Sequence, residues 1–415
     1  MCLRGFTVVA MSPVPFHVLP VLVLAQFAGT SLWFAVNAVM PDLQLAFGWP
    51  ATAVGSLTSA LQWGFIVGTL VFALLALADR FRATRVFLCC AMAGAACTVD
   101  AWAMVADFTA LLFWRFATGF FLAGIYPVGM KIASQWYRQG LGAALGYLVG
   151  ALVLGSASAH GLRAVADSLP WPSIMLGVAA LAAAGGLLIL TLGEPPQAPV
   201  RVTRMQWQAL GMLWTDKRVR SSVLGYFGHM WELYTLWVLL PLILGTRLSG
   251  VDLSWAAFVM LGSGALGCVL GGHAARRWGS ARVAALCLGL SGLCCLLAPL
   301  LMQAPDAVFY AWLLLWHHRG GRFAPVFNPH RAQRAAASGG QCAHADQQHR
   351  FCHQHPEHFV VRGLERRAAA GLGADGFGLG ACFGFVGLAA FGAGRYLGLA
   401  GNALNLSRWA RQVPR

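Results

Sequence analysis

The chain has 415 residues, of which 58% are hydrophobic and only 10% are charged, and its mean hydropathy is +0.66. Such a composition excludes an ordinary soluble domain, whose water-facing surface needs far more charge. The formal net charge of +15 would suit a nucleic-acid-binding protein, but the basic residues are dispersed along the chain, so we expect no nucleic-acid partner.

Apolar runs of roughly 20 residues, the length that a helix needs to cross a bilayer, follow one another as far as Trp316. Because a segment in lipid must satisfy its own backbone hydrogen bonds, we predict an all-α membrane protein. The predicted spans are 18–40, 52–77, 86–106, 109–130, 141–162, 171–192, 222–245, 254–275, 283–303, and a tenth that starts at 307 and is cut short at 316. These spans divide the chain into an N-terminal six-helix half (1–192), a cytoplasmic linker (193–220), the first part of a second half (221–316) and an aberrant tail (317–415).

The loops predict the orientation, because Lys and Arg accumulate on the cytoplasmic side of a membrane. With a cytoplasmic N-terminus, the outer loops before residue 317 hold only Arg163 and Arg247, while the inner loops hold thirteen basic residues. We therefore expect an integral protein of a bacterial inner (plasma) membrane with its N-terminus in the cytoplasm. The cysteines before the tail lie mostly inside predicted spans, where they act as small apolar residues, and we expect no metal site among them.

The first predicted span carries Gln26, Trp33 and Asn37, spaced seven and four residues apart and thus close to one stripe of a helix. We interpret Trp33 and Asn37 as candidates for the lining of a substrate cavity. Helix packing is the alternative explanation for both residues.

Two short basic loops occupy equivalent places in the two halves. Asp79, Arg80 and Arg82 follow the second span, and Arg276 and Arg277 follow the eighth. Both loops resemble the Gly-x-x-x-Asp-Arg-x-Gly-Arg loop of the major facilitator superfamily, although the first has Leu75 and Arg82 at the glycine positions and the second has Arg276 at the acidic position. The resemblance implies a bundle of two six-helix halves in which these loops latch helices in one conformation.

The fourth predicted span adds Arg115-Phe116-Ala117-Thr118-Gly119, which is similar to the Arg-x-x-x-Gly pattern of the same superfamily. An arginine inside a membrane needs a partner, a protein interior or a wet cavity, so Arg115 is a candidate for a substrate or proton pathway. A structural pair between helices is the alternative. Gly142, Gly146 and Gly150 in the fifth span have the four-residue spacing of closely packed helices.

The seventh predicted span is the most polar, with His229, Glu232 and Tyr234 close together. His229 and Glu232 share a helix face because they are three residues apart. A carboxylate beside an imidazole can hold and release a proton, so both residues are candidates for a proton pathway, with Tyr234 beside them. A structural hydrogen bond between the two is the alternative.

These features predict a secondary active transporter that moves a small solute by alternating access, coupled to protons, without an enzymatic activity or a cofactor and as a monomer. Two solute classes stay open: Arg115 favours an organic anion, whereas Trp33, Trp231 and Tyr234 equally suit an amphipathic compound.

The tail from His317 onward has a different composition, with eight of the twelve histidines and twelve of the twenty-nine Lys and Arg residues. A histidine codon read one base later encodes Ile, Met or Thr, so a shifted reading frame turns apolar sequence into histidine-rich sequence. We interpret the tail as the product of a frameshift near Trp316. Two alternatives remain. One is an intramembrane metal-binding protein or enzyme that uses Cys342, Cys352, His353, His355 and His358; the other is an inactive, truncated transporter.

Overall fold

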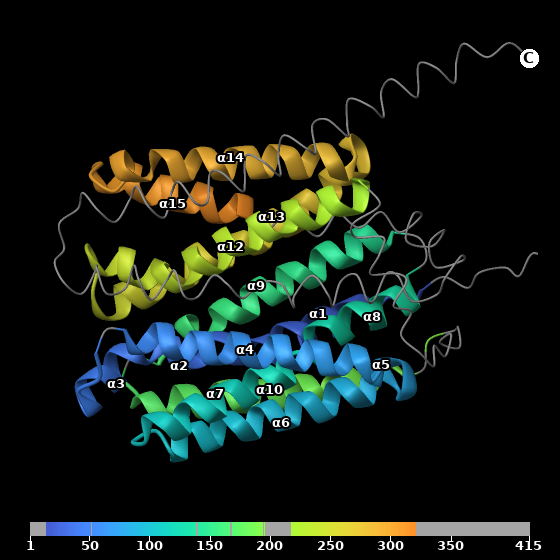
Figure 1. The fold of residues 1–415 in the computed structure, drawn as a ribbon, viewed down its shortest axis with the longest axis horizontal. Helices are drawn as coiled ribbons and strands as arrows, with labels where there is room; N and C mark the ends of the chain where they lie inside the picture. Colours follow the sequence, from blue (N-terminus) through green and yellow to red (C-terminus); the bar gives the residue numbers. More distant parts are fainter. Residues whose placement is uncertain are drawn as a thin grey trace, which may run out of the picture.

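The computed structural model describes residues 14–50, 52–137, 140–166, 168–193, 195 and 217–320. Within these residues, eight helices are long and apolar enough to cross a membrane. The helices lie side by side along the long axis of the molecule, with α1 to α10 in one group and α12 to α15 in the other (Figure 1). The helical architecture therefore agrees with the predicted fold class.

The first group follows the predicted spans closely but divides some of them. Its elements are α1 (Val18–Thr30), η1 (Ser31–Phe34), α2 (Ala35–Ala38), α3 (Met40–Phe47), α4 (Ala53–Leu74), α5 (Leu77–Arg80), α6 (Ala83–Ala103), α7 (Phe108–Leu122), α8 (Tyr126–Trp136), α9 (Leu141–Val165), α10 (Trp171–Leu188) and η2 (Ile189–Leu192).

The second group comprises α12 (Lys217–Gly245), α13 (Gly250–Trp278), α14 (Ser280–Leu301) and α15 (Asp306–Gly320). Most of the predicted linker lies outside the described residues, and α12 already begins within its last four positions. The prediction ended the tenth span at Trp316, whereas α15 continues to Gly320. The rest of the tail lies outside the described residues.

The first predicted span is interrupted near its middle, for reasons that are visible in its sequence. The hydroxyls of Thr30 and Ser31 donate to the carbonyl oxygens of Gln26 and Ala28, each at 2.7 Å, which competes with the regular backbone ladder. Pro41, in the first turn of α3, has no N–H and so cannot continue a helix from the preceding residues. Between α1 and α2 the chain passes through the 3-10 turn η1, whose four residues are all buried.

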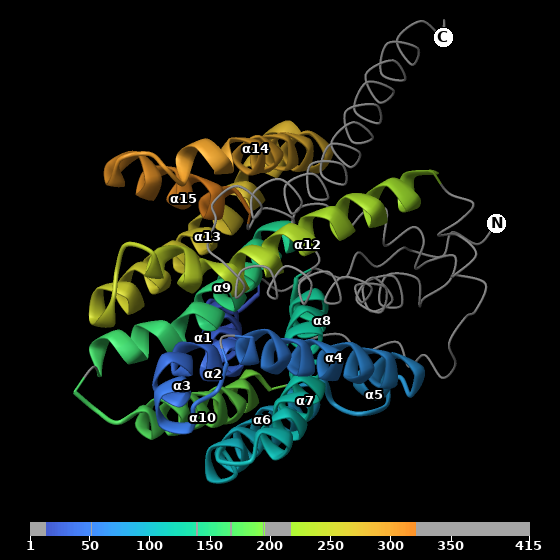
Figure 2. The ribbon, with the colours of Figure 1, turned by 60° about the vertical axis from the view of Figure 1, so that its left-hand side comes forward.

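The two groups meet mainly where α9 packs along α13, as Figure 2 shows from a second direction. A Cβ added to Gly146 would lie 3.2 Å from the carbonyl oxygen of Cys268, and one added to Gly150 would lie 3.1 Å from that of Ala265. Gly146 and Gly150, two of the three glycines singled out in the sequence, therefore lie at the close contact between the two halves, whereas a Cβ added to Gly142 would meet nothing within 4 Å. One cluster of buried apolar residues continues from the first group into the second.

Candidate functional site

Arg115 lies behind the interruption in the first span. Its side chain is 1% exposed, and its guanidinium donates to the carbonyl oxygens of Leu32 at 3.3 Å and Trp33 at 2.7 Å. Both carbonyls belong to η1, the 3-10 turn that interrupts the first span. No carboxylate in the described part of the chain pairs with Arg115, and its Nε atom is buried without a partner. The arginine thus supports the broken helix and keeps a positive charge that no described acidic residue balances.

Trp33 and Tyr234, both predicted as pathway residues, meet across the contact between the two halves. Their rings are nearly parallel, with 6.0 Å between centroids and 19° between planes. Trp33 also contacts Phe65 of α4 at 4.9 Å, and Phe34 meets Trp237 of α12 at 5.7 Å. Aromatic side chains from η1, α4 and α12 therefore gather at one place between the halves.

Asn37 lies in α2, directly after η1. Its Nδ2 donates to Thr58 Oγ1 of α4 at 2.9 Å, and Thr58 in turn donates to a carbonyl of its own helix. Gln62 follows Thr58 by four residues and precedes Phe65 by three, so it lies on the same face of α4. Its Nε2 is buried without a partner. Sequence reasoning missed Gln62, although a glutamine inside a span is a signal of its own.

Glu232 is 4% exposed and points away from this aromatic contact. Residues two apart on a helix lie about 200° apart, so Glu232 and Tyr234 occupy nearly opposite faces of α12. Oε1 of Glu232 accepts hydrogen bonds from Ser291 Oγ of α14 and, at 2.6 Å, from Trp316 Nε1 of α15. Cys295 Sγ lies 3.5 Å from the same oxygen. Oε2 is buried, and no donor in the described residues reaches it.

His229 is buried one turn before Glu232, as the spacing predicted. Glu232 hydrogen-bonds to residues of α14 and α15. Its donors Ser291 and Trp316 are 59 and 84 residues away in sequence, so helical spacing could not reveal them.

The two predicted latch loops differ in their contacts. Asp79, in α5, pairs with Lys131 of α8, whose ammonium also donates to the carbonyl of Ala78. Arg80 and Arg82 are exposed. In the other loop, Arg276 and Arg277 lie exposed in the last turn of α13, where positive charge suits a helix C-terminus. Lys131 was not among the predicted site residues, although it is the acid's partner.

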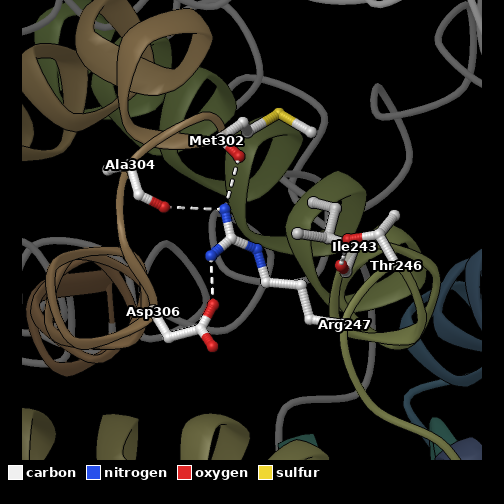
Figure 3. A network of polar contacts seen from close by, with 6 residues as sticks. All are labelled: Ile243, Thr246, Arg247, Met302, Ala304 and Asp306. Atoms are coloured by element: carbon white, nitrogen blue, oxygen red, sulfur yellow. Dashed lines mark hydrogen bonds and ion pairs between the residues drawn. The ribbon is translucent and has the colours of Figure 1, made fainter.

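Arg247, one of the two arginines in the predicted outer loops, joins three helices (Figure 3). It follows α12, donates to the carbonyl oxygens of Met302 and Ala304 at 2.8 and 2.9 Å, and pairs with Asp306 at the start of α15. Its guanidinium also lies 4.1 Å from the ring centroid of Phe309. Sequence reasoning used Arg247 only for orientation and missed this network, which ties α12, α14 and α15 together at one end.

The described residues contain no group of three or more His, Cys, Asp or Glu side chains placed to hold a metal. The Cys- and His-rich part of the tail lies outside them.

A bundle of membrane-length helices in two groups, with buried charges inside, is that of a polytopic membrane protein. Residues 22–331 match the sequence pattern of the Major Facilitator Superfamily, and the chain belongs to this family of transporters. The matched residues run past Trp316. No curated protein matches the chain.

Two solved structures are similar in fold. One is the proton:xylose symporter XylE bound to 6-bromo-6-deoxy-D-glucose, with 13% identity, a TM-score of 0.70, and coverage of 92% of this chain and 94% of that one. The other is the transporter FucP in the outward conformation, with 14% identity, a TM-score of 0.65, and coverage of 91% and 98%. At such identities the likeness shows the fold alone.

Proposed function

We propose that this protein moves a small solute across a bacterial inner membrane by alternating access, coupled to protons, as a monomer with its N-terminus in the cytoplasm. The observation that carries the proposal is the carboxylate of Glu232, which is buried inside the second half and has one oxygen that no described residue contacts by a hydrogen bond. An ionisable group at such a place is costly and commonly serves transport. XylE, whose fold is similar, is a proton symporter, and this similarity supports proton coupling as the proposal for this chain.

In this proposal the solute binds where the halves meet. Trp33 and Asn37 line the site from the first half, and Tyr234 lines it from the second. Rocking of α9 against α13 would separate or join the parts of the site that belong to the two halves. The glycines at this contact have no side chains that would block the movement of one helix along the other. Glu232 would carry the proton, and His229 would lie on its pathway. The loops with Asp79, Arg80, Arg82, Arg276 and Arg277 would latch the inner ends.

Of the two solute classes, we propose the organic anion. Arg115 is buried beside the backbone of Trp33 without a carboxylate among the described residues, so its charge has no counter-ion. A buried charge is tolerated when a partner balances it. An anionic solute would supply that partner, whereas an amphipathic compound without a negative charge would not.

The proposal is tested with purified protein in liposomes that contain a pH-sensitive dye. Small carboxylates and, in parallel, amphipathic cations are added outside, and movement of protons with the solute is recorded. We expect a carboxylate to evoke proton movement and Glu232→Gln to abolish it. Asp252→Asn, which neutralises an exposed carboxylate at the start of α13, is the control and should retain it. Proton movement that persists undiminished in Glu232→Gln would refute the role of Glu232.

A further inference from the structure

Only one of the two carboxylate oxygens of Glu232, Oε1, accepts hydrogen bonds from described residues. Ser291 and Cys295 are four residues apart on α14 and so present their side chains on one face of that helix. Together with Trp316 of α15 they direct two hydrogen-bond donors and a thiol toward Oε1. No described residue donates to Oε2. The two oxygens of one carboxylate therefore have opposite surroundings.

This asymmetry decides where a proton can bind. The lone pairs of Oε1 are occupied by donors, and a proton there would displace them. Oε2 is free to receive it. Burial disfavours the charged carboxylate, whereas the donors on Oε1 favour it. Removing or withdrawing a donor therefore shifts the equilibrium toward the protonated carboxyl group.

From this arrangement we infer that Ser291 and Trp316, assisted by Cys295, are positioning residues that set the proton affinity of Glu232, with Oε2 as the proton-binding atom. The inference rests on the proposed function, in which Glu232 carries the proton. It adds a means by which the proton is taken up and released. The donors belong to α14 and α15 and the carboxylate to α12, so movement between these helices changes the hydrogen bonds to the carboxylate.

The network of Arg247 supports a link to conformation. It ties the same three helices together just beyond Gly245, the last residue of α12. Gly245 lies thirteen residues after Glu232 and so about 20 Å away along the helix axis. A fixed point at one end allows α12 to tilt against α14 and α15 at the level of Glu232. Tilting that withdraws the donors favours the protonated state, and tilting that restores them favours release.

The test follows the protonated carboxyl group itself by infrared difference spectroscopy of the full-length protein titrated with protons, without any solute. A carboxyl C=O band that Glu232→Gln removes belongs to Glu232. We expect Ser291→Ala and Trp316→Phe each to move the midpoint of this band to higher pH by about one to two units, since each removes a donor to the ionised form. Cys295→Ala should move it less, because a thiol is a weak donor. Ser291→Thr keeps the hydroxyl and should restore the original midpoint.

Matched controls remove the same groups elsewhere in the second half. Ser254→Ala removes an exposed hydroxyl of α13, and Trp278→Phe removes an exposed indole N–H at the end of the same helix. Both should leave the midpoint unchanged. If Ser291→Ala does not fold, as judged by size-exclusion chromatography, Trp316→Phe and Cys295→Ala still test the order of the shifts.

Unchanged midpoints in the folded Ser291 and Trp316 variants would overturn the inference, as would the absence of any band assigned to Glu232. The outcome is independent of transport. If the midpoints shift but Glu232→Gln keeps full proton coupling, the proposed function is refuted and the positioning role stands. If Glu232→Gln loses coupling but the midpoints do not shift, the positioning role is refuted and the proposed function stands.

Discussion

Arg115 illustrates how a single buried side chain can serve two purposes. Its guanidinium bonds to two carbonyls of η1, and it also leaves a positive charge inside the first half. A planar fork of donors reaches both carbonyls at once, which the single ammonium of a lysine does less well.

We therefore predict that Arg115→Lys destabilises the protein by about 2 kcal/mol, the order of a hydrogen bond to a charged group. Thermal unfolding in detergent measures the effect as a lower Tm. Arg85→Lys, an exchange at an exposed loop position, is the control and should leave the Tm unchanged. Equal Tm values for Arg115→Lys and the unaltered protein would contradict the supporting role of Arg115 for η1.

At this scale the sequence identifies the kind of residue but not its partner. Depth in an apolar run is enough to single out Arg115 and Glu232, because a charge there needs an explanation. The partners are backbone carbonyls in one case and Ser291 and Trp316 in the other. They are brought in by tertiary packing across 59 to 84 residues, which no local pattern encodes.

Among the helices, the closest packing lies within the first half, between α4 and α7. A Cβ added to Gly119 would lie 1.9 Å from the carbonyl oxygen of Leu61, and one added to Gly64 would lie 1.8 Å from that of Phe116. Contacts this short require the backbones to move apart. Gly119, part of the motif that follows Arg115, is therefore needed for packing in this structure.

Gly119→Ala should destabilise the bundle by about 3 kcal/mol, since the clash is with backbone that cannot rotate away. Gly142→Ala is the matched control on α9, because a Cβ there meets nothing within 4 Å. We expect a clear loss of Tm or of monodisperse protein for the first variant and an unchanged or slightly higher Tm for the second. Equal behaviour of the two variants would contradict the packing of α4 on α7.

The positions of the spans could be predicted from the sequence because length and hydrophobicity are set by the bilayer. The interruptions at η1 and between α7 and α8 could not be read from hydrophobicity, because a broken span and a straight one are equally apolar. Their signals were present in Thr30, Ser31, Pro41 and Pro127, all of which compete with or remove helical hydrogen bonds. The pairing of α9 with α13 likewise needed the structure, although the glycine spacing indicated a close contact.

At the scale of the whole molecule, the tail from His317 onward differs in composition from the rest of the chain. Trp316 completes the donor set of Glu232, whereas the next residue, His317, is buried with its Nε2 unpartnered in the described part of the chain. Its Nδ1 pairs with the carbonyl oxygen of Leu313 at 3.2 Å, so one of the two ring nitrogens is satisfied within the helix. A buried nitrogen without a partner in the described residues is costly, which agrees with a frameshift near Trp316.

Sequencing of the underlying DNA across the Trp316 codon should then reveal an insertion or deletion relative to a frame that encodes further apolar spans. A second measurement, mass spectrometry of the purified protein, identifies which tail is made. A confirmed, unshifted frame with peptides from the histidine-rich tail would contradict the frameshift and would reopen the metal-binding alternative.

Solute accumulation in proteoliposomes under an imposed proton gradient tests the proposed transport most directly, with this chain and a frame-restored version compared side by side. The labelled solute is the carboxylate that evokes proton movement. We predict accumulation above the outside concentration in the frame-restored protein, lost when an ionophore collapses the gradient and lost in Glu232→Gln. Accumulation that ignores the gradient, or no accumulation by the folded, frame-restored protein, would contradict proton-coupled transport.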